Sequence, residues 1–187
     1  MNSTQIQSNK KAKIIPFIIA LLGSVAVVAA FFLPFASASG DYREMLSAFS
    51  YNTTVGGVNI SASEAADISM FSFARIYTAI GGSFGIVYGI LIYALGALSA
   101  LTLIFAIFKK AIPTIIFDIA TLAALCLMIW DFSDRGLLPS DSYNYGAGFY
   151  IYLLGLTAAL VGSIWLLIVK IKQKRQLKAI NNSGGNQ

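Results

Sequence analysis

One carboxylate stands out among the residues whose types could do chemistry. Asp118 lies within an apolar stretch, eight residues beyond Lys110, which corresponds to a depth of about 12 Å in an α-helix. An ionised carboxylate is unfavourable at such a depth in a bilayer, so an intramembrane acid is by default a hypothesis of function. Asp118 could relay a proton or a cation, contact a polar residue on a partner's helix, or remain protonated and structural.

Hydroxyl groups supply the hydrogen-bond partners that a protonated Asp118 would need. Four hydroxyl residues of the other apolar stretches lie at a similar depth, the last less closely: Ser99, Thr102, Ser163 and Ser24. No lysine or arginine lies deep enough for an ion pair, because Lys170 should extend its ammonium group to the surface. We therefore favour a protonated, hydrogen-bonded Asp118 and keep the relay and the partner contact as alternatives.

The composition argues against an enzyme. The chain contains no histidine and a single cysteine, Cys126, which excludes a histidine base, an intrachain disulfide and a multi-cysteine zinc site. No phosphate-binding loop, dinucleotide fingerprint, zinc-protease motif or nucleophile elbow occurs in the sequence. Asp118 also lacks a second intramembrane aspartate. We expect no enzymatic activity, no cofactor and no metal.

Four apolar stretches must position these side chains. Hydrophobic residues make up 57% of the 187-residue chain and charged residues 11%, against ~25% charged in a typical soluble domain. A membrane-spanning helix needs roughly 20 apolar residues, and four stretches qualify: residues 14–35, a segment within 76–108, residues 111–130 and residues 147–169. The predicted fold is an all-α membrane protein, a four-transmembrane-helix bundle over residues 14–170. It lies between an N-terminal tail, 1–13, and a basic, partly disordered tail, 171–187.

The distribution of charge predicts the direction of the spans. Ten lysines and arginines flank the N-terminus, the turn between the second and third spans, and the C-terminal tail, with no acid among them. The opposite side carries three arginines and seven acids. The positive-inside rule therefore places both termini in the cytoplasm, in the plasma membrane. The net charge of +5 thus indicates orientation, not nucleic-acid binding.

Two outer loops, residues 37–75 and 131–146, predict a small extracellular cap. The first is too long for a simple connection. Its pieces MLSAFSY and VNISAS are separated by turn residues and suggest a short β-hairpin. Ser61, followed three residues later by Glu64, resembles a capping box from which a helix could continue into the second span. That helix would either project outward or bend at Gly81-Gly82.

The cap also carries charged and aromatic side chains. Five charged residues are candidates for contact with a partner: Arg43, Arg75, Asp131, Asp134 and Arg135. Asp131 and Arg135 are four residues apart and could pair on a helix. Five aromatic residues near the fourth span suit an interfacial aromatic belt better than a ligand-binding patch: Tyr143, Tyr145, Phe149, Tyr150 and Tyr152.

Glycine spacing predicts close packing of the helices. The second span carries Gly81, Gly85 and Gly89 at four-residue intervals, a small-xxx-small face that lets helix backbones approach in lipid. The fourth span carries three glycines at seven-residue intervals, typical of a left-handed seam: Gly148, Gly155 and Gly162. We favour packing within the chain; a homo-oligomer or a larger membrane partner is the alternative.

Three segments carry a resemblance to a known group. They are FLPFASASGDYRE (Phe32–Glu44), ISMFSFARIY (Ile68–Tyr77) and DFSDRGLLPSDSYNYG (Asp131–Gly146). With these segments the chain resembles small four-span membrane proteins of Clostridia-type Gram-positive bacteria, for which no activity is established. In outline the chain also looks claudin-like, but residues 37–75 contain no Trp and no Cys, so a claudin-type junction function is not carried over.

These patterns together favour a non-enzymatic membrane subunit. We expect an accessory, interaction or sensor-like protein that uses its cap and its small-residue helix faces. Its partners would be the lipid bilayer and another membrane protein or a second copy, and no nucleic acid. The competing hypothesis is a small transporter or channel with Asp118 in the proton or ion path. An immunity or envelope-stress protein is a third, weaker hypothesis.

Overall fold

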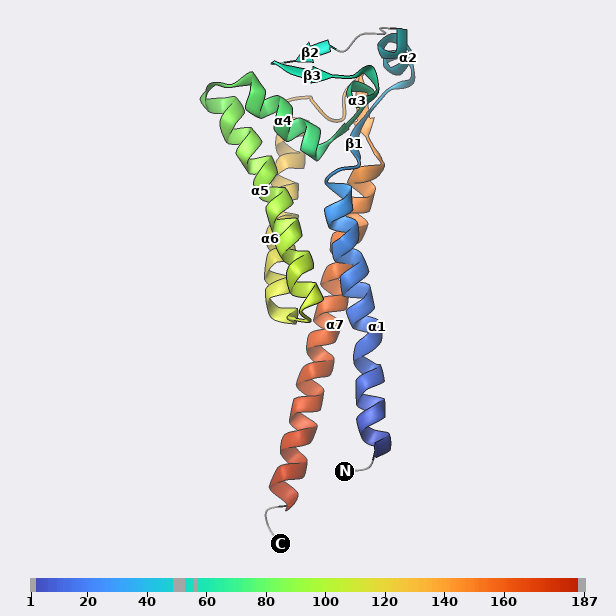
Figure 1. Cartoon of the computed structure of the whole chain (residues 1–187), viewed down its shortest axis with the longest axis vertical. Coiled ribbons are helices and arrows are strands. Elements are labelled where there is room, and N and C mark those ends of the chain that lie inside the picture. The colour runs from blue at the N-terminus through green and yellow to red at the C-terminus, as the bar shows by residue number, and fades with distance from the viewer. Residues whose placement is uncertain (1–2, 49–52, 56, 185–187) are drawn as a thin grey trace.

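The computed structural model describes residues 3–48, 53–55 and 57–184. Seven helices and five short strands follow one another along the described chain (Figure 1). In order they are α1 (Ser3–Ala30), β1 (Pro34–Ala38), α2 (Gly40–Ala48), β2 (Thr53–Val55), β3 (Val58–Ile60), α3 (Ala62–Ala66), β4 (Asp67–Ser69), α4 (Met70–Ile80), α5 (Gly82–Ile107), α6 (Ala111–Asp134), β5 (Tyr143–Tyr145) and α7 (Ala147–Gly184).

Four of these helices are long and apolar enough to cross a membrane. Their candidate spans are Ala12–Ala30 of α1, Gly82–Ile107 (α5), Ala111–Asp134 (α6) and Ala147–Lys178 of α7. The helices form a ring in which α1 contacts α7, α7 contacts α6, α6 contacts α5, and α5 contacts α1. Both termini lie at one end and the short elements form a cap at the other (Figure 1). The predicted all-α membrane bundle is confirmed, and the chain is a multi-pass integral membrane protein.

The ends of the spanning helices differ from the predicted boundaries. α1 ends at Ala30 rather than at residue 35, because Pro34 disfavours a helical conformation at the residue before it and starts strand β1. α6 continues past Trp130 to Asp134. Residues 3–9 and 179–184 are helical, so α1 and α7 continue beyond the predicted spans.

A three-stranded antiparallel sheet ties the cap to the bundle, with the order β4-β1-β5. In the central strand, Ala36 pairs with Ile68 of β4 and with Tyr145 of β5. The sheet therefore joins the outer end of α1 to the segments that precede α4 and α7. Strands of three residues carry no detectable periodicity, and the sequence prediction did not include this sheet.

The predicted β-hairpin is present but its first strand was placed wrongly. β2 and β3 pair between Thr53 and Ile60, so the second strand matches the VNISAS piece. The first piece, MLSAFSY, begins inside helix α2, which runs through Ala48; residues 49–51 lie outside the described residues. Asp41 in the first turn of α2 favours the helix because its negative charge faces the positive end of the helix dipole.

The helix predicted from Ala62 into the second span is broken twice. Ser61 does cap α3, accepting a hydrogen bond of 3.1 Å from the Glu64 amide, but α3 ends after five residues because the next three pair with β1 as strand β4. The second break is the predicted bend at Gly81-Gly82. Both glycines have positive φ values, 72° and 68°, which glycine adopts without steric strain. This turn folds α4 back against α5.

The hydrophobic core lies where the cap meets the bundle. It combines buried residues from β1, α4 and all four spanning helices. The largest side chains that are fully buried include Phe35, Met70, Leu125, Phe132 and Tyr152. The cap is therefore part of the same folded unit as the bundle.

Candidate functional site

Asp118 lies on the inner face of α6 and is almost completely enclosed. Only 1% of the residue is exposed, and its Oδ1 atom has no hydrogen-bond partner among the described residues. Its own chain covers it, so a partner's helix cannot reach it in this arrangement. Native proteins satisfy most buried polar atoms, and an unpaired one calls for an explanation such as a function or a bound water or ion.

The hydroxyl groups near Asp118 bond to their own helices. Ser99 Oγ donates to the Leu95 carbonyl at 2.9 Å, and Thr102 Oγ1 donates to the Leu98 carbonyl at 3.0 Å. Ser24 does the same with Ala20 at 2.8 Å. The predicted hydrogen bond from Asp118 to Ser99, Thr102 or Ser163 is absent from the described structure. A serine or threonine in a helix can satisfy its hydroxyl on the carbonyl four residues earlier, which leaves that proton unavailable to the carboxyl group.

The spanning helices nevertheless bury several further polar side chains in the interior of the bundle. All four spanning helices contribute to this set, which comprises Ser24, Ser99, Thr102, Thr114, Asp118, Thr121 and Ser163. In the antiparallel pair α5 and α6, Thr102 lies eight residues before Lys110 and Asp118 eight residues after it. Equal spacing from the turn places these two at the same depth, about 12 Å from it. We call these seven residues the polar layer.

Tyr152 joins α7 to α5 next to this layer. Its hydroxyl lies 2.5 Å from Ser99 Oγ, and the residue is fully buried. The assignment of Tyr152 to an interfacial aromatic belt was wrong. The sequence contained a signal for this position, since residue 152 falls on the same 3-4 repeat as Gly148, Gly155 and Gly162 and so faces α1 and the bundle interior.

The arginines of the cap are bound within the chain. Arg43 forms a two-pronged ion pair with Asp67, with distances of 2.7 and 2.9 Å. Ser37 Oγ adds a hydrogen bond of 2.8 Å to the same carboxylate. Despite partial burial, the pKa of Asp67 lies below its ordinary value. The hydrogen bond from Arg43 is the main cause, and the hydrogen bond from Ser37 contributes less. This cluster fastens α2 to the central sheet.

Two further clusters hold the other predicted cap residues. Arg75 pairs with Glu64 at 3.0 Å, and Ser72 Oγ donates to the same carboxylate oxygen at 2.7 Å. Arg135 pairs with Asp131 one helical turn away and lies over the ring of Tyr88, 4.5 Å from its centroid.

Four of the five cap residues predicted to contact a partner, Arg43, Arg75, Asp131 and Arg135, therefore take part in internal contacts. Asp134 is exposed and forms no ion pair within the described part of the chain.

Gly155 and Gly162 of α7 lie directly against α1, and Gly148 lies against the segment that follows α1. A Cβ atom added at Gly155 would lie 3.0 Å from the Gly23 carbonyl oxygen, and one at Gly148 would lie 2.7 Å from the Leu33 carbonyl oxygen. At Gly162 it would meet the Ala20 and Pro16 backbone within 3 Å. These positions admit only glycine because the two backbones are in contact.

The glycines of α5 face α4 instead of another span. Added Cβ atoms at Gly85 and Gly89 would collide with Tyr77 and Thr78 of α4. Gly81, predicted to belong to this packing face, lies in the α4–α5 turn and contacts no other helix. Its role is conformational, since the turn requires its positive φ.

No group of three or more His, Cys, Asp or Glu side chains that could hold a metal ion occurs within residues 3–48, 53–55 and 57–184. In comparisons with known proteins, no family model, no curated protein and no solved structure matches this chain.

Proposed function

We propose that the protein is a non-enzymatic interaction subunit of the plasma membrane, with its cap outside the cell and both termini in the cytoplasm. The cap would recognise a membrane or extracellular partner. One observation carries the proposal: the glycine faces and the arginines of the cap are used within the chain, whereas α2 buries none of its residues. This leaves α2 as a helix whose side chains are mostly exposed.

The attachment of α2 supports a recognition role. The Arg43 ion pair holds one side, and Tyr42 packs edge-to-face on Tyr143 with the ring centroids 5.3 Å apart. Met45 on the same helix remains 47% exposed. A helix that is fixed in position loses little conformational freedom on binding, which favours affinity.

The experiment is photo-crosslinking in the native host combined with copurification of the full chain. A photoreactive amino acid at Met45 should yield one discrete crosslinked product, whereas the same group at the exposed Asp134 should not. The product should copurify in stoichiometric amount and be lost from Arg43→Ala, in which α2 is released from the sheet. Equal products at both positions, or a partner retained in full by Arg43→Ala, would contradict a role for α2.

A second candidate function is supported by the unpaired Oδ1 of Asp118. A carboxyl group that is buried in the bundle without a partner is suited to bind a proton or a small cation in transit. Protein in liposomes loaded with a pH-sensitive dye should then move protons or cations, and Asp118→Asn should abolish the flux. Flux that survives in Asp118→Asn, or its absence from the unaltered protein, would reject this candidate.

A further inference from the structure

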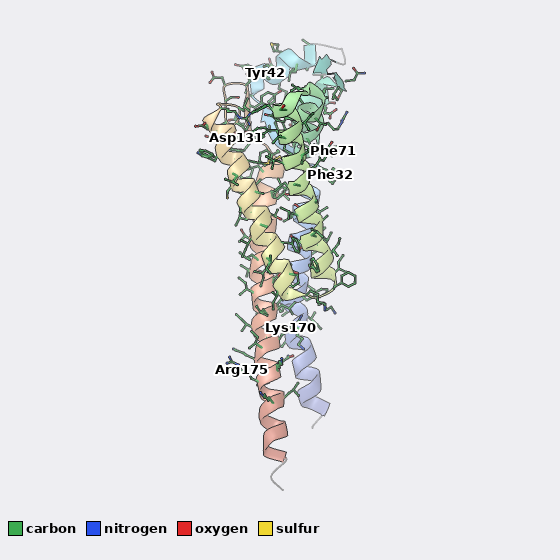
Figure 2. All side chains as sticks on the ribbon, turned by 90° about the vertical axis from the view of Figure 1, so that its left-hand side faces the viewer. Phe32, Tyr42, Phe71, Asp131, Lys170 and Arg175 are labelled. Carbon is green, nitrogen blue, oxygen red and sulfur yellow. The ribbon has the colours of Figure 1, made fainter. Side chains whose placement is uncertain are left out.

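Four lysines from three segments converge at the end of the bundle that carries the termini. Lys170 of α7 donates a hydrogen bond to the Lys109 carbonyl oxygen in the α5–α6 turn. Its ammonium group is within electrostatic reach of Lys13 on α1, of Lys109 and of Lys110. Figure 2 shows Lys170 on α7 at the level of the α5–α6 turn. We call these four residues the lysine collar.

The backbone at Lys109 shows that the collar is a built feature. Lys109 has a φ of 56°, in the left-handed region at the end of a helix where glycine is the usual residue. The amide of Lys109 donates to the Ala106 carbonyl, and that of Lys110 to the Phe105 carbonyl, both at 2.9 Å. The side chain is held as well, because its ammonium lies 4.6 Å from the centre of the Phe17 ring. Glycine would adopt this φ without strain, whereas the lysine found here adds a positive charge to the turn.

No acidic side chain of residues 3–48, 53–55 and 57–184 lies at the collar. None of the eight acidic residues lies beyond Lys110 toward this end; along α6 the first is the enclosed Asp118. The like charges of this set repel one another, and an anion placed among them would be attracted by each of them. Ammonium groups bind phosphate as point charges that each donate several hydrogen bonds.

The residues around the collar are those that contact acyl chains. Ile14, Ile107, Phe108 and Ile112 are each more than half exposed and lie within a few residues of a collar lysine. The collar thus lies where the apolar part of the spans ends, which is the depth of the headgroups in a bilayer.

We propose that the lysine collar binds the phosphate headgroup of an anionic phospholipid, with the acyl chains along the adjacent apolar residues. With the orientation of the proposed function, the lipid belongs to the cytoplasmic leaflet, whose anionic lipids attract basic residues at the membrane surface. The binding site is distinct from the basic tail beyond it, in which Lys174, Arg175 and Lys178 are all exposed.

The test measures the thermal stability of the purified full chain in nanodiscs of phosphatidylcholine, with and without phosphatidylglycerol. The variant Lys109→Gln/Lys170→Gln removes two charges from the collar, and Lys174→Gln/Lys178→Gln removes the same number from the tail. Each lysine at the surface is worth about fivefold in affinity for anionic lipid. The collar variant should therefore bind phosphatidylglycerol about 25-fold more weakly and lose most of the stabilisation, whereas the tail variant, which leaves all four collar lysines in place, keeps it.

A second variant separates lipid binding from folding. Lys109→Gly removes the ammonium but supplies the residue that the turn prefers. It should be at least as stable as the unaltered protein in phosphatidylcholine, and should gain less from phosphatidylglycerol. The proposal fails if the tail variant loses as much of the lipid effect as the collar variant, or if Lys109→Gly responds to phosphatidylglycerol in full. It also fails if inorganic phosphate, with no anionic lipid present, stabilises the protein equally.

Discussion

The two main helix pairs of the bundle differ in the residues at their interfaces. Helices α1 and α7 meet through glycine and alanine, with backbone against backbone at Gly23, Gly155 and Gly162. Helices α5 and α6 face each other at the corresponding depth through Thr102, Asp118 and their hydroxyl neighbours. The first interface gains its stability from close contact between the two backbones. The second retains an unpaired carboxyl group that destabilises it, so the bundle separates a structural interface from one that is suited to function.

The largest expected effect is on the glycine interface. Gly162→Leu would force a side chain into the backbone of α1, and overpacking of this kind costs about 3 kcal/mol or more where backbone must move. We expect a large fall in the melting temperature, or loss of the monodisperse protein, measured by thermal unfolding and size exclusion in detergent. Val161→Leu is the matched control, since Val161 is 53% exposed. An unchanged melting temperature in Gly162→Leu would show that the interface is looser than described.

The polar interface should respond in the opposite direction. Asp118→Leu removes the unpaired oxygen and fills a similar volume, so we expect the protein to become more stable by about 1–3 kcal/mol. Thr121→Val serves as the control, because the Thr121 hydroxyl is already bonded to the Phe117 carbonyl at 2.7 Å and its removal should not stabilise the protein. A lower melting temperature for Asp118→Leu would mean that the carboxyl group has a favourable partner, such as a bound water or ion.

A smaller effect should come from the hydrogen bond between Tyr152 and Ser99, which joins α7 to α5. Tyr152→Phe removes the contact with Ser99 and should lower stability by about 0.5–1.5 kcal/mol. Tyr150→Phe, on an exposed ring of the same helix, should leave stability unchanged. Equal melting temperatures for the two variants would show that the short contact contributes nothing.

The smallest effect contrasts the unpaired carboxyl group of the bundle with a paired one in the cap. The pKa of Asp67 is lowered in the folded protein, so this carboxylate contributes stability above its ordinary pKa of 3.8 and loses it as the pH falls through the lower, folded value. Because the pair is partly exposed, its contribution should stay below about 1 kcal/mol.

The measurement is the melting temperature between neutral pH and pH values below 3.8, for the unaltered chain, Asp67→Asn and the control Asp141→Asn. Asp67→Asn should begin slightly less stable and lose less on acidification, whereas Asp141→Asn should follow the unaltered chain. Identical pH profiles for Asp67→Asn and the unaltered chain would exclude a contribution from the ion pair.

The features that were predictable from sequence are those that repeat along a helix. Long apolar stretches with at most one charge gave the four spans, and the paired glycines gave the bend before α5. Pairing between distant segments was not predictable, because strands such as Asp67–Ser69 are too short for a pattern and exist only through their contact with β1.

The candidate site was likewise predictable only in part. The depth of Asp118 followed from counting residues, but its missing partner did not. Whether a hydroxyl such as that of Ser99 bonds to its own backbone or to a neighbouring helix depends on the detailed packing.

The central position of β1 has a consequence for how the chain is made. Ala36 can pair on both sides only after Tyr145 has been synthesised, and the two residues are 109 positions apart in the sequence. At a synthesis rate of ~5–20 residues per second, this delay is on the order of 5–20 s. During that interval the strand has an unpaired edge that other extended segments could occupy. The sheet can close only once the last transmembrane helix is being inserted, which makes its closure a late marker of correct membrane assembly.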